Sequence, residues 1–189
     1  MNFPLLKTCL FFFIAPSLSS YSEESPKSNF ARQTIDLGIV VTDIEKSLAF
    51  YKQVIGFTEN EGFKVSGKFP KLVGLTDGAP LDISVLTLGD GDEATKLKLM
   101  EVESQKPTRV IKQAHIHTVA GPSYLTIMVK DVDQVLKRAQ KHGYKPYAKS
   151  PQVLPDGLPQ DICLLMLKDP DGNFVEIVGP LTTELKAKK

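Results

Sequence analysis

The chain has 189 residues, which is enough for one domain with a sizeable core or for two small modules that share a core. Its 23 basic and 22 acidic side chains nearly balance, so there is no surplus of positive charge to hold a phosphate backbone. The composition therefore argues against a nucleic-acid partner.

The first 22 residues have the pattern of a secretory signal peptide. Lys7 is their only charged side chain, and the apolar run 9–15 is followed by Pro16 and small residues. This run is far shorter than the roughly 20 residues that span a membrane. We expect export to the periplasm or the extracellular space, with cleavage after Ser19 or Ser22. The alternative is a disordered apolar tail. Residues 23–32 are expected to form a flexible lead-in.

In residues 35–41 the apolar side chains of Leu37, Ile39 and Val41 fall on one face, which predicts a strand. Asp43 stands where a helix N-cap belongs, and apolar residues at helical spacing continue to Ile55. Gly56 can end this helix in a left-handed conformation. The remaining elements expected here are strands at 57–65, 81–88 and 96–102, and a loop at 66–80 with a helical turn at 71–75.

Residues 104–121 are polar and irregular, and they are predicted to connect two halves of the chain. A strand at 124–129 then leads to Asp131, which forms a capping-box pattern with Gln134 at the start of a second helix. The elements expected after the end of this helix at Gly143 are strands at 144–149, 162–167 and 174–178, and a basic tail at 181–189.

One pattern occurs in both halves, since the segment 41–48 recurs as 129–136 at the same place between strand and helix. Such a repeat indicates two copies of one supersecondary unit. Each copy is a strand, a helix and three strands, which makes the fold class α+β. The helices need an apolar sheet face to cover them, so the opposite sheet faces are left to line a cavity. Those faces carry the polar side chains of Asp36, Lys98, Tyr124 and Glu176.

The segments 39–57 and 169–178 resemble the vicinal oxygen chelate superfamily, which includes glyoxalase I, methylmalonyl-CoA epimerase, extradiol dioxygenases and the bleomycin resistance proteins. The resemblance covers residues 33–180, with module one at 33–103 and module two at 122–180. It implies paired βαβββ modules that form a curled mixed sheet around a central cup, with the helices on the outer face.

The resemblance also implies a divalent metal held by the first and fourth strands of each module. Counting seven residues back from the two helix-capping aspartates gives Asp36 and Tyr124, and the fourth strands give Lys98 and Glu176. The carboxylates of Asp36 and Glu176 suit Zn, Ni, Fe or Mn. Tyr124 is a poor ligand, because a tyrosine phenol is neutral below its ordinary pKa of ~10. Lys98 would put an ammonium beside the metal. We therefore expect a degenerate metal site, in which Lys98 pairs with Glu176 or with Asp36.

By resemblance, the protein holds a small molecule in the cup, with Tyr124, Thr126 and Lys98 as substrate-binding residues. If it is an enzyme, it is a lyase or isomerase that moves a proton next to a carbonyl, with Glu176 as general base. The alternative is a metal-free protein that binds or sequesters a small ligand, as resistance proteins do. Either a monomer or a homodimer is compatible with two modules in one chain.

His115 and His117 form a His-x-His pair in the expected connector. On a strand such a pair could bind a metal, because two imidazoles would point the same way. In an irregular connector it is more often part of a solvated surface. The sequence leaves the role of the pair open.

Overall fold

The computed structural model describes residues 29–103, 110 and 112–181. The first module contains β1 (Leu37–Val40), α1 (Ile44–Ala49), the π-helix η1 (Phe50–Ile55), β2 (Thr58–Val65), α2 (Phe69–Leu72), β3 (Leu81–Thr87) and β4 (Lys96–Val102). After the short 3-10 helix η2 (Ile116–Thr118), the second module contains β5 (Tyr124–Met128), α3 (Val132–Lys141), β6 (Gln152–Val153), β7 (Ile162–Lys168) and β8 (Phe174–Pro180).

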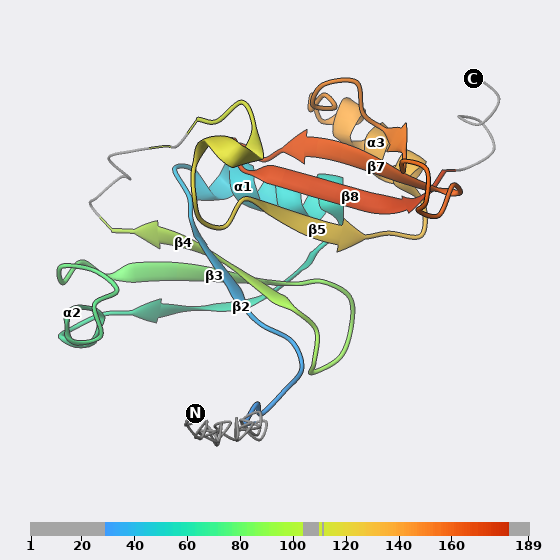
Figure 1. Ribbon diagram of the computed structural model, residues 1–189. Coiled ribbons are helices and arrows are strands. Elements are labelled where there is room, and N and C mark those ends of the chain that lie inside the picture. Colours follow the sequence, from blue (N-terminus) through green and yellow to red (C-terminus); the bar gives the residue numbers. More distant parts are fainter. Residues whose placement is uncertain (1–28, 104–109, 111, 182–189) are drawn as a thin grey trace, which may run out of the picture. The chain divides into compact units, whose positions relative to one another are not determined.

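Each module builds one four-stranded mixed sheet, and the two sheets repeat the same topology (Figure 1). The strand orders are β1-β4-β3-β2 and β5-β8-β7-β6. In each sheet the first strand pairs in parallel with the fourth, and the other pairings are antiparallel. The α+β class and the paired modules are thus confirmed. The two sheets do not close into one continuous sheet.

The helices cover the apolar faces of the sheets, as the alternation of side chains predicts. Val41 directly follows β1, and Ile127 lies in β5. Both belong to the same buried cluster as residues of η1 and α3. This cluster takes side chains from both modules, so the modules share one core. Each fully buried aliphatic or aromatic side chain contributes about 1.5–3 kcal/mol to folding.

The first helix starts where the sequence predicts but changes its winding. Asp43 is the N-cap, and its carboxylate accepts a hydrogen bond from the backbone N–H of Lys46 at 3.1 Å. From Phe50 onward the helix becomes a π-helix, which ends when the N–H of Gly56 donates to the carbonyl of Tyr51 at 3.0 Å. Gly56 has φ 106°, a left-handed conformation that favours glycine.

Polar contacts from the second module hold η1 in place. The guanidinium of Arg138 on α3 donates to the carbonyl oxygens of Val54 and Ile55 at 2.8 and 3.1 Å, at the C-terminal end of η1. The buried hydroxyl of Tyr51 donates to Asp169 at 2.9 Å. These contacts satisfy backbone and side-chain groups that would otherwise be buried without partners.

Two local predictions are wrong. No strand forms at 144–149; the chain turns there, with Ala148 at φ 54°, and the short β6 lies further on. The hydroxyl of Ser150 donates to the carbonyl of Tyr147 and holds this turn. The helical turn expected at 71–75 is instead α2, because Pro70 is preorganised for the first turn of a helix.

Some predicted segments lie outside the described residues. They are the signal peptide at 1–22, most of the lead-in, connector residues 104–109 and 111, and all but the first residue of the tail at 181–189. Across the described ranges, every helix is too short or too polar to cross a membrane.

Candidate functional site

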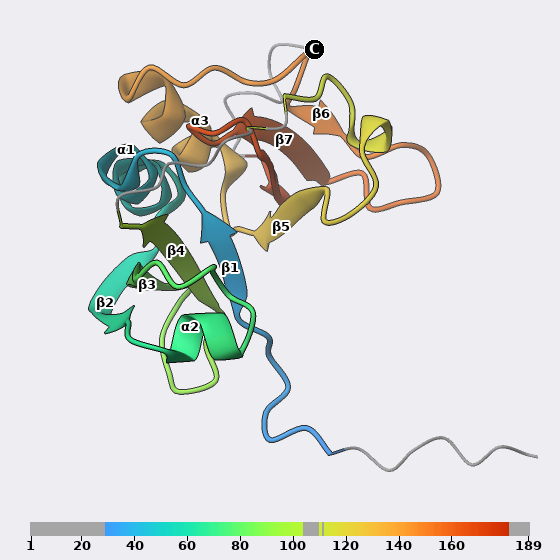
Figure 2. The same ribbon diagram turned by 90° about the vertical axis from the view of Figure 1, so that its left-hand side faces the viewer.

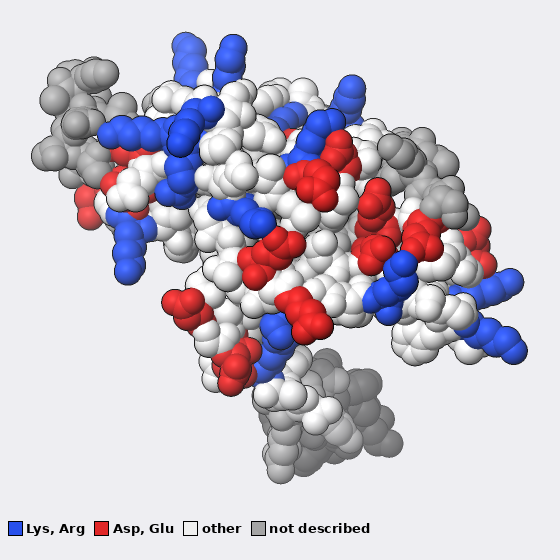
Figure 3. Space-filling view, turned by 180° about the vertical axis from the view of Figure 1, so that it is seen from behind, with Lys and Arg blue, Asp and Glu red and all other residues white. Residues whose placement is uncertain are grey.

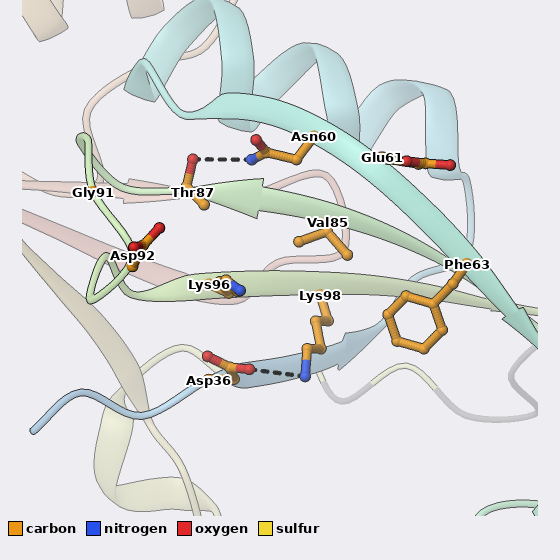
Figure 4. A pocket seen from close by; sticks show the side chains of 10 residues that line it. All are labelled: Asp36, Asn60, Glu61, Phe63, Val85, Thr87, Gly91, Asp92, Lys96 and Lys98. Carbon is orange, nitrogen blue, oxygen red and sulfur yellow. Dashed lines mark hydrogen bonds and ion pairs between the residues drawn. The ribbon is translucent and has the colours of Figure 1, made fainter. Parts of the chain in front are cut away.

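A hollow of about 650 Å³ lies on the face of the first sheet that the helices do not cover (Figure 4). Its walls come from the three antiparallel strands of the first module, from the turn after β3 and from the residue before β1. The lining residues are Asp36, Asn60, Glu61, Phe63, Val85, Thr87, Gly91, Asp92, Lys96 and Lys98. All of them belong to the first module, so this hollow is not shared between the modules.

Asp36 and Lys98 meet in this hollow, as one of the two predicted pairings requires. The ammonium of Lys98 lies 2.8 Å from the Oδ2 atom of Asp36, and the guanidinium of Arg32 bonds the Oδ1 atom. Strand register explains the contact, because Lys98 pairs with Gly38, two residues beyond Asp36. The hydrogen bond from Lys98 lowers the pKa of Asp36 below its ordinary 3.8, and Arg32 adds to this effect while burial opposes it.

The pairing of Lys98 with Glu176, which the sequence favoured slightly, does not form. Glu176 lies on β8 in the second sheet, directly across from Thr126 on β5, whose hydroxyl donates to the Glu176 carboxylate. Lys98 and Glu176 are thus on different sheets; Lys98 pairs with Asp36, just before β1, and Glu176 bonds Thr126 on β5. The structure therefore brings together two pairs of predicted site residues rather than one group of four.

Tyr124 lies at a second hollow, of about 340 Å³, which the two modules do share. One wall is residues 37–40 of β1 and the other is residues 122–125 around the start of β5. Figure 2 shows these two strands next to each other. Tyr124 is 47% exposed, and its hydroxyl can reach a ligand in this hollow rather than in the first one.

His115 and His117 stack on each other, with ring centroids 5.5 Å apart and planes 6° from parallel. Both are exposed and border an apolar hollow of about 400 Å³. Its other walls come from the connector, the turn after α3 and the two central strands of the second sheet. These residues are Ala114, Ile116, Tyr147, Met166 and Phe174.

The side chains that stand at the four metal-ligand positions do not fit a divalent ion. Both carboxylate oxygens of Asp36 already bond cationic side chains, and Glu176 is on the other sheet. Over residues 29–103, 110 and 112–181, no three His, Cys, Asp or Glu side chains group closely enough to hold a metal. Zn²⁺ sites usually take at least three protein ligands. The degenerate metal site therefore stays the better interpretation of these residues.

The first hollow also contains residues that the sequence reasoning did not select. Asn60, Phe63, Thr87 and Lys96 all line it. The period of two in β4 could have identified Lys96, since it lies two residues before Lys98 and so faces the same side. Asn60 and Phe63 could not be found in this way, because the register of β2 shifts between them.

Charges of both signs are mixed over the face of the molecule seen in Figure 3. Lysine and arginine side chains lie among aspartate and glutamate side chains on this face, and neither sign forms a continuous stripe. This distribution agrees with the nearly balanced composition.

Solved structures of glyoxalase proteins share this fold. A glyoxalase family protein from Bacillus cereus superposes with a TM-score of 0.67 at 18% identity, covering 84% of this chain and 99% of its own. The trypanothione-dependent glyoxalase I of Leishmania major gives 0.52 at 20% identity, covering 84% and 94%. Glyoxalase I from Zea mays gives 0.56 at 15% identity, covering 80% of this chain and 46% of that longer one.

No curated protein sequence matches the chain. The profile described as Glyoxalase/Bleomycin resistance protein/Dioxygenase superfamily matches residues 34–177, which is most of the chain and both modules. The match includes the segment 39–57, all but the last residue of the segment 169–178, and strands of both sheets. The chain belongs to the Glyoxalase/Bleomycin resistance protein/Dioxygenase superfamily.

Proposed function

We propose that this protein binds a small organic molecule in the hollow of its first module, and that it does so without a metal ion. The observation that carries the proposal is the ion pair of Asp36 and Lys98, 2.8 Å apart at two positions where the family resemblance implies metal ligands. A lysine ammonium supplies locally the positive charge that a metal would supply. It also repels a dication that approaches Asp36.

The size and chemistry of the hollow support this proposal. Small-molecule sites are concave, of about 300–1,000 Å³, with apolar walls and a few polar groups. The first hollow has about 650 Å³, with Phe63 and Val85 as apolar walls, and most of its other lining side chains are polar or charged, which suits a ligand with polar groups. It is thus large enough for a ligand of drug-like or metabolite size.

A lyase or isomerase activity is supported less well. It would use Glu176 as the base and Asp36 and Tyr124 to orient the substrate. Asp36 lines the first hollow, Tyr124 lines the second, and Glu176 bonds Thr126 across β5 and β8. General acid–base groups must lie within hydrogen-bond reach of one substrate. Binding without turnover therefore suits this arrangement better.

The proposal is tested with the mature protein after treatment with EDTA and dialysis. We expect no stoichiometric Zn, Ni, Fe or Mn by elemental analysis. A thermal-shift set of small organic acids, amides and alcohols should contain ligands that bind equally well with and without EDTA. Asn60→Trp, which fills the hollow from an exposed position, should abolish this binding, while Lys145→Trp on the second module should not. One equivalent of metal surviving dialysis would overturn the proposal, and so would a complete lack of ligands.

A second test asks whether Lys98 is what excludes the metal. Lys98→Glu places a carboxylate beside Asp36 instead of an ammonium, so divalent-metal affinity in calorimetric titration should rise about tenfold or more, a change of ~1.4 kcal/mol. Lys141→Glu makes the same charge change on the exposed end of α3 and should leave the metal affinity unchanged. Equal affinities for the two variants would show that Lys98 does not control metal binding.

Export remains part of the proposal. It rests on the apolar run 9–15 and the small residues that follow it. A protein that binds or sequesters a small molecule would then act outside the cytoplasm.

A further inference from the structure

One lysine in the first hollow has no hydrogen-bond or ion-pair partner among the residues that the structure describes. Lys96 and Lys98 are two residues apart on β4, so both side chains point to the same side of the sheet. Lys98 forms an ion pair with Asp36, whereas Lys96 forms no hydrogen bond or ion pair with the described part of the chain. Lys96 is nevertheless half-buried in the hollow (Figure 4). A half-buried ammonium without a partner is available to an anionic group of a ligand.

The residues next to Lys96 are neutral and polar. Thr87 on β3 pairs directly with Lys96, and the amide of Asn60 donates to the Thr87 hydroxyl at 3.0 Å and to the carbonyl of Thr58 at 3.2 Å. These bonds fix the amide and the hydroxyl in place. The end of the hollow at Lys96 is therefore polar, and its amide and hydroxyl groups are held in fixed positions.

The other end of the hollow is apolar. Val85 pairs with Lys98 on the neighbouring strand, and Phe63 pairs with Ile83 one strand further on. Phe63 is 48% exposed, so its ring offers an apolar surface that no part of the described chain covers. Removing such surface from water contributes about 25 cal/mol for each Å².

Two carboxylates at the rim limit how much negative charge the hollow accepts. Glu61 and Asp92 are exposed and have no ion-pair partner among the described residues. Lys96 can offset one anionic group in direct contact with it, and the two carboxylates oppose a second one by like-charge repulsion.

We infer that the ligand of this hollow is a monocarboxylate with an aromatic or aliphatic body. Its carboxylate lies on the Lys96 ammonium, and its body lies on Phe63 and Val85. This inference rests on the proposed function, because it names the ligand class of the same site. No covalent step is involved, and the Asp36–Lys98 pair stays intact when the ligand binds.

Three probes with the same phenyl body test the inference in calorimetric titrations of the mature protein. They are 3-phenylpropionate, the neutral 3-phenylpropionamide and the dianion phenylsuccinate. We expect 3-phenylpropionate to bind about tenfold or more tightly than either of the others, as a charge-assisted hydrogen bond requires. Lys96→Met should lower the affinity for 3-phenylpropionate to that of the amide, leave the amide unchanged and keep the far-ultraviolet circular dichroism. Lys96→Arg should restore most of the affinity, and Lys141→Met should change nothing.

The outcomes separate this inference from the proposed function. Equal binding of acid and amide, both blocked by Asn60→Trp, would overturn the carboxylate preference and leave the metal-free binding site standing. Tighter binding of phenylsuccinate would overturn the preference for one charge. If none of the three probes binds, the inference is wrong. The proposed function fails as well only when the wider set of organic acids, amides and alcohols also contains no ligand.

Discussion

Asp169 is one of the two residues described above through which the second module holds η1, the other being Arg138. Its carboxylate is buried and accepts hydrogen bonds from the Tyr51 hydroxyl at 2.9 Å, from the backbone N–H groups of Asp171 and Asn173, and from the Asn173 amide. Burial raises the pKa of Asp169 above 3.8, and the bonds from Asn173 and Tyr51 oppose that rise. The turn that contains Asp169 therefore joins β7 to β8 and also holds η1.

Tyr51→Phe removes one of these bonds and leaves a buried carboxylate with one partner fewer. We expect the free energy of unfolding at pH 7 to fall by about 1–3 kcal/mol in urea titrations. Tyr124→Phe is the matched control, because Tyr124 is half-exposed and its hydroxyl bonds no described residue. A loss as large in the control would mean that the effect does not come from the buried bond.

The stability that Tyr51→Phe loses relative to wild type depends on pH in a direction that the pKa of Tyr51 determines. Burial raises the pKa of Tyr51 well above 10. The negative charge of Asp169 and the hydrogen bond to its carboxylate raise this pKa further. A group whose pKa is raised in the folded state stabilises the protein fully below its unfolded pKa, and this contribution is lost as the pH rises through the folded value. The stability difference between wild type and Tyr51→Phe should thus be constant near neutrality and shrink above pH ~10.

Among the strands, β8 passes so close to the backbone at the end of β5 that there is no room for a side chain on it at that point. Val129 donates from its backbone N–H to the carbonyl of Val178 at 2.8 Å, next to Gly179. A Cβ atom on Gly179 would lie 2.2 Å from the carbonyl oxygen of Val129. Backbone on both sides would have to move, so glycine is required here by close approach.

Gly179→Ala should therefore destabilise the fold by about 3 kcal/mol, measured by urea or thermal unfolding. Gly38→Ala in β1 is the control, because its added Cβ would lie 3.0 Å from the Cε atom of Met100, the far end of a flexible side chain. We expect a loss below about 1 kcal/mol there. Similar losses in the two variants would show that the tight passage of β8 is not the cause.

At the scale of the whole molecule, the two modules are joined by a common core and by the contacts of Arg138 and Asp169 with η1. The first hollow nevertheless belongs to one module, and the second hollow lies between both. The duplicated fold therefore contains one hollow within a module and another between the modules. Of the four positions where metal ligands are implied, Asp36 and Lys98 line the first hollow, and Tyr124 lines the second.

Export is a prediction for the whole chain. Mass spectrometry of the protein recovered outside the cytoplasm should find its N-terminus at Ser20 or Glu23, the residues after the two predicted cleavage positions. Phe12→Arg puts a charge into the apolar run and should keep the uncut chain in the cytoplasm. An intact Met1 on exported protein, or export of the variant, would contradict the signal peptide.

The sequence by itself determined the repeat, the α+β class and most strand and helix positions. Alternation and helical spacing are local properties, and the caps Asp43 and Asp131 bond backbone groups two or three residues away. The expected strand at 144–149 does not form, because Ala148 has φ 54° and the hydroxyl of Ser150 bonds the carbonyls of Tyr147 and, on β7, of Met166, which holds a turn there. Such contacts are not encoded in local periodicity.

Only the tertiary structure decided which side chains meet. The sequence placed Asp36, Lys98 and Glu176 on uncovered sheet faces, but it allowed Lys98 either carboxylate as a partner. The parallel pairing of β1 with β4 brings Lys98 to Asp36, whereas Glu176 belongs to the other sheet. Strand register and the separation of the two sheets fix distances between residues far apart in the chain, and these distances decide whether charges form an ion pair, a metal site or a binding hollow.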